Sequence, residues 1–145
     1  MDNNVILIVE DNADDVLLIK RALEHVGVRN LTQVAQDGNE AIAYLDGEGR
    51  FANRTKYPLP RVVFLDLNLP GKTGHEILAW MAEREALGEI VRVVLTGSDD
   101  PSDLRKAYEL GANSYLIKPL TAEQLTLPKR NLRMLLLGRP LLEGV

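Results

Sequence analysis

The sequence predicts an α/β protein in which a parallel β-sheet is covered by helices on both faces. Short apolar blocks rich in β-branched residues alternate about five times with stretches whose apolar residues recur at helical spacing. The blocks are apolar throughout, which is typical of strands buried on both faces of a sheet. The chain of 145 residues has the length of one domain, and its 46% of hydrophobic residues suffices for a core.

Five blocks are expected to form the strands. They are Val5–Val9, Leu31–Ala35, Val62–Leu65, Val91–Thr96 and Ser114–Ile117. The connection that precedes the third block, Gly47–Pro60, is long, mostly polar and contains both glycine and proline. We interpret it as a surface loop rather than a linker between domains.

Helices are expected between and after these strands. The first has an apolar face made of Val16, Ile19, Leu23 and Val26. Asn12 can cap this helix, and Asp14 and Asp15 then lie in its positively polarised first turn. The other helices are expected over residues 39–46, over residues 74–85, after Pro101 with an apolar face of Leu104, Ala107, Tyr108 and Leu110, and after a capping box at Thr121–Gln124. Gly111 is placed to end the fourth helix.

Composition excludes several classes of function. The net charge of −4 argues against nucleic-acid binding, which favours basic surfaces. The absence of cysteine excludes disulfides, thiol chemistry and cysteine-ligated zinc. The N-terminus is acidic and polar, and no apolar run reaches the ~18 residues of a membrane span. We therefore expect a soluble cytoplasmic protein that does not contact a membrane.

Polar residues follow the predicted strands at the points where the strands end. Glu10 and Asp11 follow the first block, Asp66 follows the third, Thr96 closes the fourth, and Lys118 follows the fifth. Ligands of an open parallel sheet bind beyond the carboxyl ends of its strands. We therefore expect these five side chains to meet at one edge of the sheet.

The chemistry of this set favours a magnesium-dependent phosphoryl site. Three crowded carboxylates repel one another, and a hard divalent cation with oxygen ligands relieves that repulsion. Asp11 and Asp66 are the expected direct ligands, with Glu10 acting through water. Lys118 and Thr96 supply an ammonium group and a hydroxyl for a phosphoryl group. Asp66 can then act as the nucleophile and form an aspartyl phosphate.

Most of these residues also have a structural explanation on their own, which is weakest for Asp66 because the run before it is so apolar. Acids after a strand often cap the next helix, a threonine at a strand end is ordinary, and most lysines are solvated. It is the occurrence of all five at the expected strand ends that favours a site. His25 and His75 do not lie at strand ends and are expected to be surface residues of helices without a catalytic role, and Trp80 is expected to pack partly on the core.

The segments that contain these residues resemble the receiver domain of two-component response regulators. The matching motifs are VEDN, LDLNLPG, LTGS and GANSYLIKP, and the resemblance extends from about Val5 to Leu125. It implies a flavodoxin-like (βα)5 fold, a three-layer sandwich whose parallel five-stranded sheet has the order 2-1-3-4-5. It also implies a signalling protein rather than an enzyme, with self-catalysed phosphorylation and dephosphorylation.

The resemblance assigns roles to the site residues. Asp66 is expected to take a phosphoryl group from a phosphohistidine of a sensor histidine kinase. Mg²⁺ is expected on Asp11, Asp66 and the backbone carbonyl of Asn68, with Glu10 in the same acidic pocket. Lys118 is expected to pair first with Asp66 and then with the phosphoryl group.

The resemblance also implies a switch. Thr96 is expected to move onto the phosphoryl group while Tyr115 rotates inward behind it, which changes the loop after Thr96 and the fourth helix. From the residues alone, Tyr115 is a half-buried aromatic residue of a strand. The peptide between Lys118 and Pro119 is expected to be cis.

The long connection and the LDLNLPG form resemble the small single-domain regulators of phytochrome-type histidine kinases. We expect a receiver domain over residues 1–127 and a C-terminal extension over residues 128–145, in which Pro128 interrupts the fifth helix and many leucines follow. The extension is too short for a DNA-binding or enzymatic output domain. We expect it to be an arm that forms a homodimer, through the fourth helix and fifth strand of a second copy, although packing on its own domain is the alternative.

Two other functions remain open at this stage. One is a magnesium-dependent phosphohydrolase with an aspartate nucleophile, but such enzymes need an acid two residues after the nucleophile, where this chain has Asn68. The other is a receiver that docks partners independently of phosphorylation. The downstream partner cannot be named from the sequence.

Overall fold

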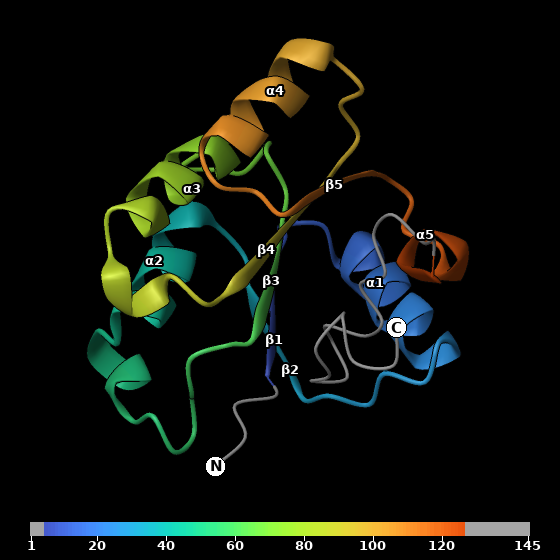
Figure 1. Ribbon diagram of the computed structural model, residues 1–145. Helices are drawn as coiled ribbons and strands as arrows, with labels where there is room; N and C mark the ends of the chain where they lie inside the picture. Colours follow the sequence, from blue (N-terminus) through green and yellow to red (C-terminus); the bar gives the residue numbers. More distant parts are fainter. Residues whose placement is uncertain (1–4, 127–145) are drawn as a thin grey trace, which may run out of the picture.

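Five parallel strands form the centre of the computed structural model, which describes residues 5–126 (Figure 1). The strands are β1 (Ile6–Val9), β2 (Thr32–Ala35), β3 (Val62–Leu65), β4 (Val91–Thr96) and β5 (Ser114–Ile117). Their order in the sheet is β2-β1-β3-β4-β5. The predicted α/β class and the flavodoxin-like strand order are confirmed.

The register of the sheet aligns the carboxyl ends of the strands. Val9 of β1 lies opposite Leu65 of β3, and Thr96 of β4 lies opposite Ile117 of β5. The residues that follow β1, β3 and β5 therefore leave the sheet at the same edge. This alignment determines that the candidate site lies at the carboxyl edge of the sheet.

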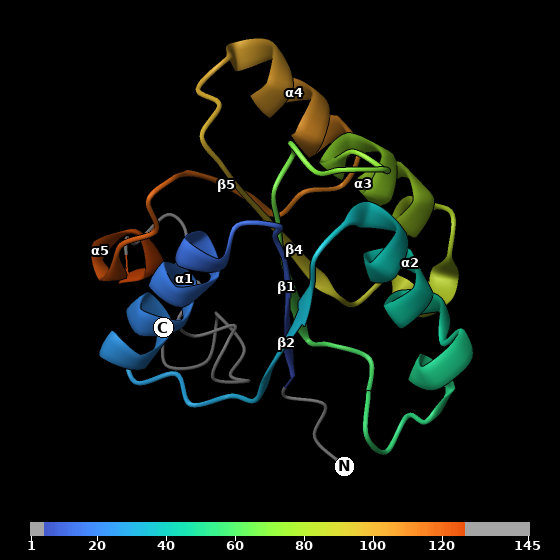
Figure 2. The same cartoon turned by 180° about the vertical axis from the view of Figure 1, so that it is seen from behind.

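Helices cover both faces of the sheet, as Figures 1 and 2 show from opposite sides. They are α1 (Ala13–His25), α2 (Gly38–Asp46), α3 (Gly74–Ala82), α4 (Pro101–Glu109) and α5 (Ala122–Thr126), with 3₁₀ turns η1 (Gly49–Ala52) and η2 (Glu85–Leu87). α1 and α5 lie on one face, and α2, α3 and α4 lie on the other. Because successive residues of a strand point to opposite faces, Ile6 and Ile8 pack with the first group while Leu7 and Val9 pack with the second.

The helix starts follow the predicted capping chemistry. The side chain of Asn12 accepts a hydrogen bond from the backbone N–H of Asp15 at 3.0 Å. Thr121 and Gln124 form the predicted capping box at the start of α5. Gly111, after α4, has a φ of 107°, a backbone conformation that favours glycine. The sequence pattern therefore located these helix ends correctly.

α3 ends at Ala82, three residues before the predicted end at 85. Beyond it, the guanidinium of Arg84 donates to the carbonyl of Trp80 at 2.9 Å and lies 3.9 Å from the centre of the Trp80 ring. η2 then buries Leu87. The expectation that Trp80 packs partly on the core is confirmed.

Three predictions about apolar segments are wrong in detail. Leu31 was expected in a buried strand, but its side chain is 63% exposed. It precedes β2, which lies at the edge of the sheet and pairs only with β1. On α4, Ala107 is buried, whereas Leu104 and Tyr108 are 42% and 44% exposed. α4 therefore presents part of its expected apolar face to solvent.

The connection Gly47–Pro60 is more than a surface loop. Phe51 within η1 is buried, and its ring lies 5.1 Å from that of Tyr44 and 5.0 Å from that of Tyr57. The guanidinium of Arg54 donates to the carbonyls of Tyr44 and Leu45 at the end of α2. The loop therefore packs its aromatic residues on the core beside α2, which its polar composition did not predict.

No helix among residues 5–126 is long and apolar enough to cross a membrane. The extension predicted over residues 128–145 lies outside the described residues, so its predicted role as an arm stays a prediction.

Candidate functional site

Three carboxylates meet at the carboxyl edge of the sheet, as predicted. Each of Glu10, Asp11 and Asp66 offers an oxygen, and these oxygens all lie within 4.8 Å of one another. Glu10 is 2% exposed and Asp66 is 6% exposed, whereas Asp11 faces solvent. Two buried acids and one exposed acid thus share one small volume that opens to water.

The backbone around Asp66 is held tightly. The N–H of Asp66 donates to the carbonyl of Val9 at 3.2 Å. The Asp66 carboxylate accepts a hydrogen bond from the N–H of Asn68 at 3.1 Å. A Cβ atom at Gly74 would lie only 2.5 Å from the carbonyl oxygen of Asp66. α3 therefore begins in direct contact with the loop that carries Asp66, and only glycine fits there.

Lys118 is the positive charge of the site. Its ammonium nitrogen lies 2.6 Å from the Glu10 carboxylate and 2.8 Å from those of Asp15 and Asp66. Burial would lower the pKa of Lys118, but the three carboxylates outweigh it and raise the pKa above 10.5. Lys118 is therefore fully charged at neutral pH.

Asp15 belongs to this site, although the sequence indicated only a helix-start acid. It lies in the first turn of α1, where its charge interacts favourably with the helix dipole, and it also reaches Lys118. No residue pattern distinguishes Asp15 from Asp14 in this respect. The orientation of α1 against β5 selects it.

Glu10 is held in an unfavourable environment for its charge. Burial raises its pKa above the usual 4.5, and the neighbouring charge of Asp66 adds to this effect. Lys118 and the N–H of Asn12 partly oppose it. A carboxylate in this position gains from an additional cation nearby.

Thr96 and Tyr115 line the site from β4 and β5. Thr96 is fully buried, and its hydroxyl has no hydrogen-bond partner among residues 5–126. Tyr115 is 3% exposed and donates to the carbonyl of Ser98 at 3.0 Å. The interpretation of Tyr115 as half-buried is therefore wrong, and its side chain lies in an inward position.

The other predicted residues fall where they were expected. The Lys118–Pro119 peptide is cis. Asn68 is exposed and begins the turn after Asp66. His25 is an exposed residue of α1, whereas His75 on α3 is half-buried, with its Nε2 atom 3.2 Å from the carbonyl oxygen of Asp103.

The donor set of the acidic cluster fits a hard divalent cation. All the side-chain ligands that it offers are carboxylate oxygens, and the exposed Asp11 leaves an open side on which water ligands fit. The cluster of Glu10, Asp11 and Asp66 could therefore hold a metal ion.

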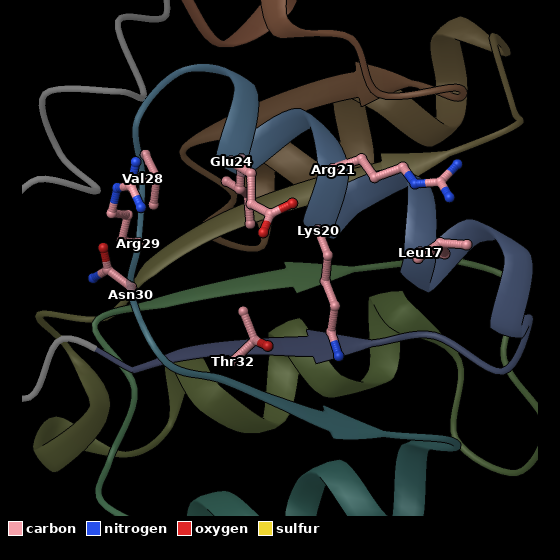
Figure 3. Close-up of a pocket in the computed structure, with 9 residues that line it drawn as sticks. Leu17, Lys20, Arg21, Glu24, Val28, Arg29, Asn30 and Thr32 are labelled. Carbon is pink, nitrogen blue, oxygen red and sulfur yellow. The ribbon is translucent and has the colours of Figure 1, made fainter.

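A separate pocket lies between α1 and the start of β2 (Figure 3). Leu17 and Leu23 contribute its apolar lining, while Lys20, from α1, and Arg29, from the following loop, bring positive charge. None of the acidic cluster lines it. The pocket is thus distinct from the site at the strand ends.

Comparison with known proteins identifies the family. The family model described as "Response regulator receiver domain" matches residues 6–128. The chain belongs to the response regulator receiver family. The predicted identification is confirmed, and members of this receiver family act generally in signalling rather than in metabolic catalysis.

Two curated regulatory proteins are similar to most of this chain. The chain is 45% identical over 127 residues to the probable methanogenesis regulatory protein FilR2 of Methanothrix harundinacea, covering 86% of this chain and 77% of that protein. It is 39% identical over 114 residues to the response regulator Rcp1 of Synechocystis, covering 79% and 76%.

A similar solved structure is that of the phosphorylated cyanobacterial phytochrome response regulator RcpA. It superimposes with a TM-score of 0.78 at 36% identity and covers 94% of this receiver and 95% of that chain. The Mn²⁺-bound form of Rcp1 gives a TM-score of 0.75 at 35% identity, covering 90% and 91%. The predicted resemblance to phytochrome response regulators is confirmed, and phosphorylation-activated signalling fits this receiver.

Proposed function

We propose that this receiver is switched by phosphorylation of Asp66, with a phosphohistidine of a sensor histidine kinase as the donor. The observation that supports it most strongly is the convergence of Glu10, Asp11, Asp66 and Lys118 on one edge of the sheet. An oxygen of Asp66 attacks phosphorus, a P–O bond forms, and the P–N bond to the kinase imidazole breaks. The imidazole leaves with the bonding electrons and takes up a proton.

Lys118, Thr96 and the N–H of Asn68 have different roles around the phosphoryl group. Lys118 stabilises the added negative charge from its position 2.8 Å from Asp66. Thr96 has a buried hydroxyl that finds no partner within residues 5–126, and it can donate to a phosphoryl oxygen. The N–H of Asn68 already orients the Asp66 carboxylate.

Mg²⁺ is the metal that we assign to the acidic cluster. Asp11 and Asp66 would hold it directly with the backbone carbonyl of Asn68, and Glu10 would act through water. When bound, Mg²⁺ supplies charge neutralisation for the phosphoryl oxygens. Support comes from the all-carboxylate side-chain donor set. The Mn²⁺-bound form of the similar Rcp1 is a further precedent for a divalent cation in such a receiver.

Incubation with acetyl phosphate tests the assignment of Asp66. Wild type should gain the mass of one phosphoryl group in Mg²⁺, and should not gain it in excess chelator. Asp66→Ala should gain none, whereas Asp46→Ala, at an exposed acid of α2, should behave as wild type. An equal mass gain in Asp66→Ala and wild type would exclude Asp66 as the acceptor.

The same experiment separates the competing functions. Steady release of inorganic phosphate from small phosphate esters would favour a phosphohydrolase, but Asn68 occupies the position of the required acid. Partner binding that is identical in wild type and Asp66→Asn would favour a docking receiver. The nearly complete burial of the Asp66 carboxylate beside Lys118 favours the phosphorylated switch instead.

We infer that the partner kinase is of the phytochrome type and that both proteins act in the cytoplasm. The similarity to RcpA and to the bacteriophytochrome response regulator AtBRR, at 40% identity, supports this choice. Phosphotransfer from a phosphorylated phytochrome-type kinase should be faster than transfer from an unrelated histidine kinase. Equal rates from both would remove the basis for the assignment.

We also infer that the receiver forms a homodimer through α4, β5 and the extension over residues 128–145. The exposed Leu104 and Tyr108 of α4 offer apolar surface for such a contact. Sedimentation velocity should give a dimer for wild type and a monomer for Leu104→Asp, with Leu31→Asp as a control at another exposed leucine. A dimer that persists in Leu104→Asp, and in a chain that ends before Pro128, would contradict this arrangement.

A further inference from the structure

His75 joins α3 to the loop that follows β4 through a chain of hydrogen bonds. Its Nε2 atom lies 3.2 Å from the carbonyl oxygen of Asp103 in the first turn of α4. A carbonyl oxygen can only accept, so this nitrogen carries the proton and donates it. The contact therefore links α3 to α4 across the groove between them.

The chain continues through side chains to Tyr115. The hydroxyl of Ser98 donates to the Asp103 carboxylate at 2.7 Å, and the backbone carbonyl of Ser98 accepts from the Tyr115 hydroxyl at 3.0 Å. The N–H of Asp100 also donates to the Ser98 hydroxyl at 3.3 Å. Ser98 is therefore fixed on both sides, by Asp103 toward α4 and by Tyr115 toward β5.

This arrangement holds Tyr115 inward. Its side chain is 3% exposed, and in the sheet Tyr115 lies opposite Val94, two residues before Thr96. The groove between α3 and α4 that His75 and Asp103 line also includes Leu67 and Asn68, which follow Asp66. The chain of hydrogen bonds therefore runs from α3, which lines this groove together with the residues after Asp66, to the interior position of Tyr115.

We propose that His75 is a positioning residue that, through Asp103 and Ser98, holds the loop after β4 in the arrangement with Tyr115 inward. We call these three side chains with the Tyr115 hydroxyl the His75 latch. The consequence for signalling rests on the proposed phosphorylation of Asp66. If a bound phosphoryl group favours inward Tyr115, then inward Tyr115 must favour the phosphoryl group by the same factor.

Two variants break the latch at different places. His75→Leu removes the donor to Asp103 while keeping a side chain of similar size in the groove. Ser98→Ala removes the hydroxyl that joins Asp103 to the loop but keeps the carbonyl that binds Tyr115. His75→Gln keeps an N–H donor and should retain wild-type behaviour. His25→Leu makes the same chemical change at an exposed histidine of α1.

Nitration by tetranitromethane, without any phosphoryl donor, measures the position of Tyr115 directly. Tyr108 is 44% exposed and serves as the internal reference, and cleavage after Glu109 separates the two tyrosines for mass spectrometry. His75→Leu and Ser98→Ala should raise the nitration of Tyr115 relative to Tyr108 about fivefold, the factor that one hydrogen bond contributes. Far-UV circular dichroism confirms that each variant is folded.

The affinity for beryllofluoride in Mg²⁺, followed by ¹⁹F NMR, then measures the coupling at equilibrium. His75→Leu and Ser98→Ala should bind it about fivefold more weakly, while His75→Gln and His25→Leu should match wild type. Unchanged nitration of Tyr115 in both folded latch variants would overturn the proposal, and so would increased nitration with unchanged affinity. If wild type binds no beryllofluoride, the phosphorylation proposal fails, and nitration alone decides whether the latch exists.

Discussion

Replacement of Lys118 by methionine should destabilise the fold by an amount that depends strongly on pH. Lys118 contacts the side chains of Glu10 and Asp66, which are only 2% and 7% exposed, and the more exposed Asp15. Methionine keeps most of the volume and removes the charge. The buried carboxylates then face each other without a cation, an arrangement that typically costs about 3–5 kcal/mol.

The cost has an upper limit that the structure and the pKa of Glu10 define. Burial already raises the pKa of Glu10 above 4.5, so in the variant this carboxyl will take up a proton rather than stay charged. Protonating at pH 7 a group whose pKa in the unfolded chain is 4.5 costs about 3.4 kcal/mol, from 1.36 kcal/mol per pH unit. We therefore expect a loss of about 3 kcal/mol in the free energy of unfolding at pH 7.

The sign of the pH dependence follows from the same proton. Between the pKa of the unfolded chain and the higher pKa of the folded variant, the folded variant binds a proton that the unfolded chain lacks. Its stability relative to wild type therefore rises as the pH falls, and at about pH 5.5 the difference should shrink to about 1 kcal/mol. Added Mg²⁺ should also stabilise the variant more than wild type, because the ion takes over the role of the ammonium group.

Urea unfolding followed by circular dichroism, in chelator at both pH values, measures these differences. Lys106→Met, at an exposed lysine of α4, is the matched control and should change the free energy of unfolding little. A loss below about 1 kcal/mol at pH 7, or a larger loss that is the same at both pH values, would refute the reasoning that buried charge repulsion dominates.

Three further predictions follow from contacts around the site and the long loop. Gly74→Ala should lower phosphorylation by acetyl phosphate at least tenfold without removing a charge, because the new methyl group would lie 2.5 Å from the carbonyl oxygen of Asp66; a rate equal to that of Gly88→Ala would contradict this. Phe51→Ala should lower the free energy of unfolding by about 3 kcal/mol in urea titrations, since it removes a buried ring, and a loss under about 1 kcal/mol would count against the packing of the loop on the core. Arg54→Leu should cost about 2 kcal/mol in the same assay by leaving the carbonyl of Leu45 without the guanidinium donor, and an unchanged midpoint would show that water replaces the guanidinium there.

The strand ends of this protein could be predicted because two simple regularities coincide. β1 and β3 are continuous apolar runs that are fully buried, so their limits are visible in the sequence. Parallel pairing in register then forces the residues after these strands to the same edge of the sheet. Glu10 and Asp66 are neighbours for this reason, and no knowledge of side-chain packing was needed to find them.

The remaining contacts depend on how helices and loops are oriented, which a linear pattern does not encode. Asp15 reaches Lys118 because α1 lies at a particular angle to the sheet, and Asp14, next to it in sequence, makes no such ion pair. His75 contacts Asp103 only because α3 and α4 pack side by side. Phe51 lies in a mostly polar segment, so the periodicity that identifies helices and strands gave no signal for its burial.

Lys118 and Thr96 differ in whether their polar groups already have partners, and this difference affects how each would respond to a phosphoryl group. Lys118 is already paired with three carboxylates, so if Asp66 is phosphorylated its ammonium group has anionic partners both before and after the reaction. Thr96 is buried with its hydroxyl unpaired among the described residues, a condition that costs about 1–3 kcal/mol. If Asp66 is the acceptor, the phosphoryl oxygen recovers this cost only when Thr96 moves toward it. The hydrogen bond that is new on phosphorylation would therefore form at Thr96, the residue from which the loop held by the His75 latch begins.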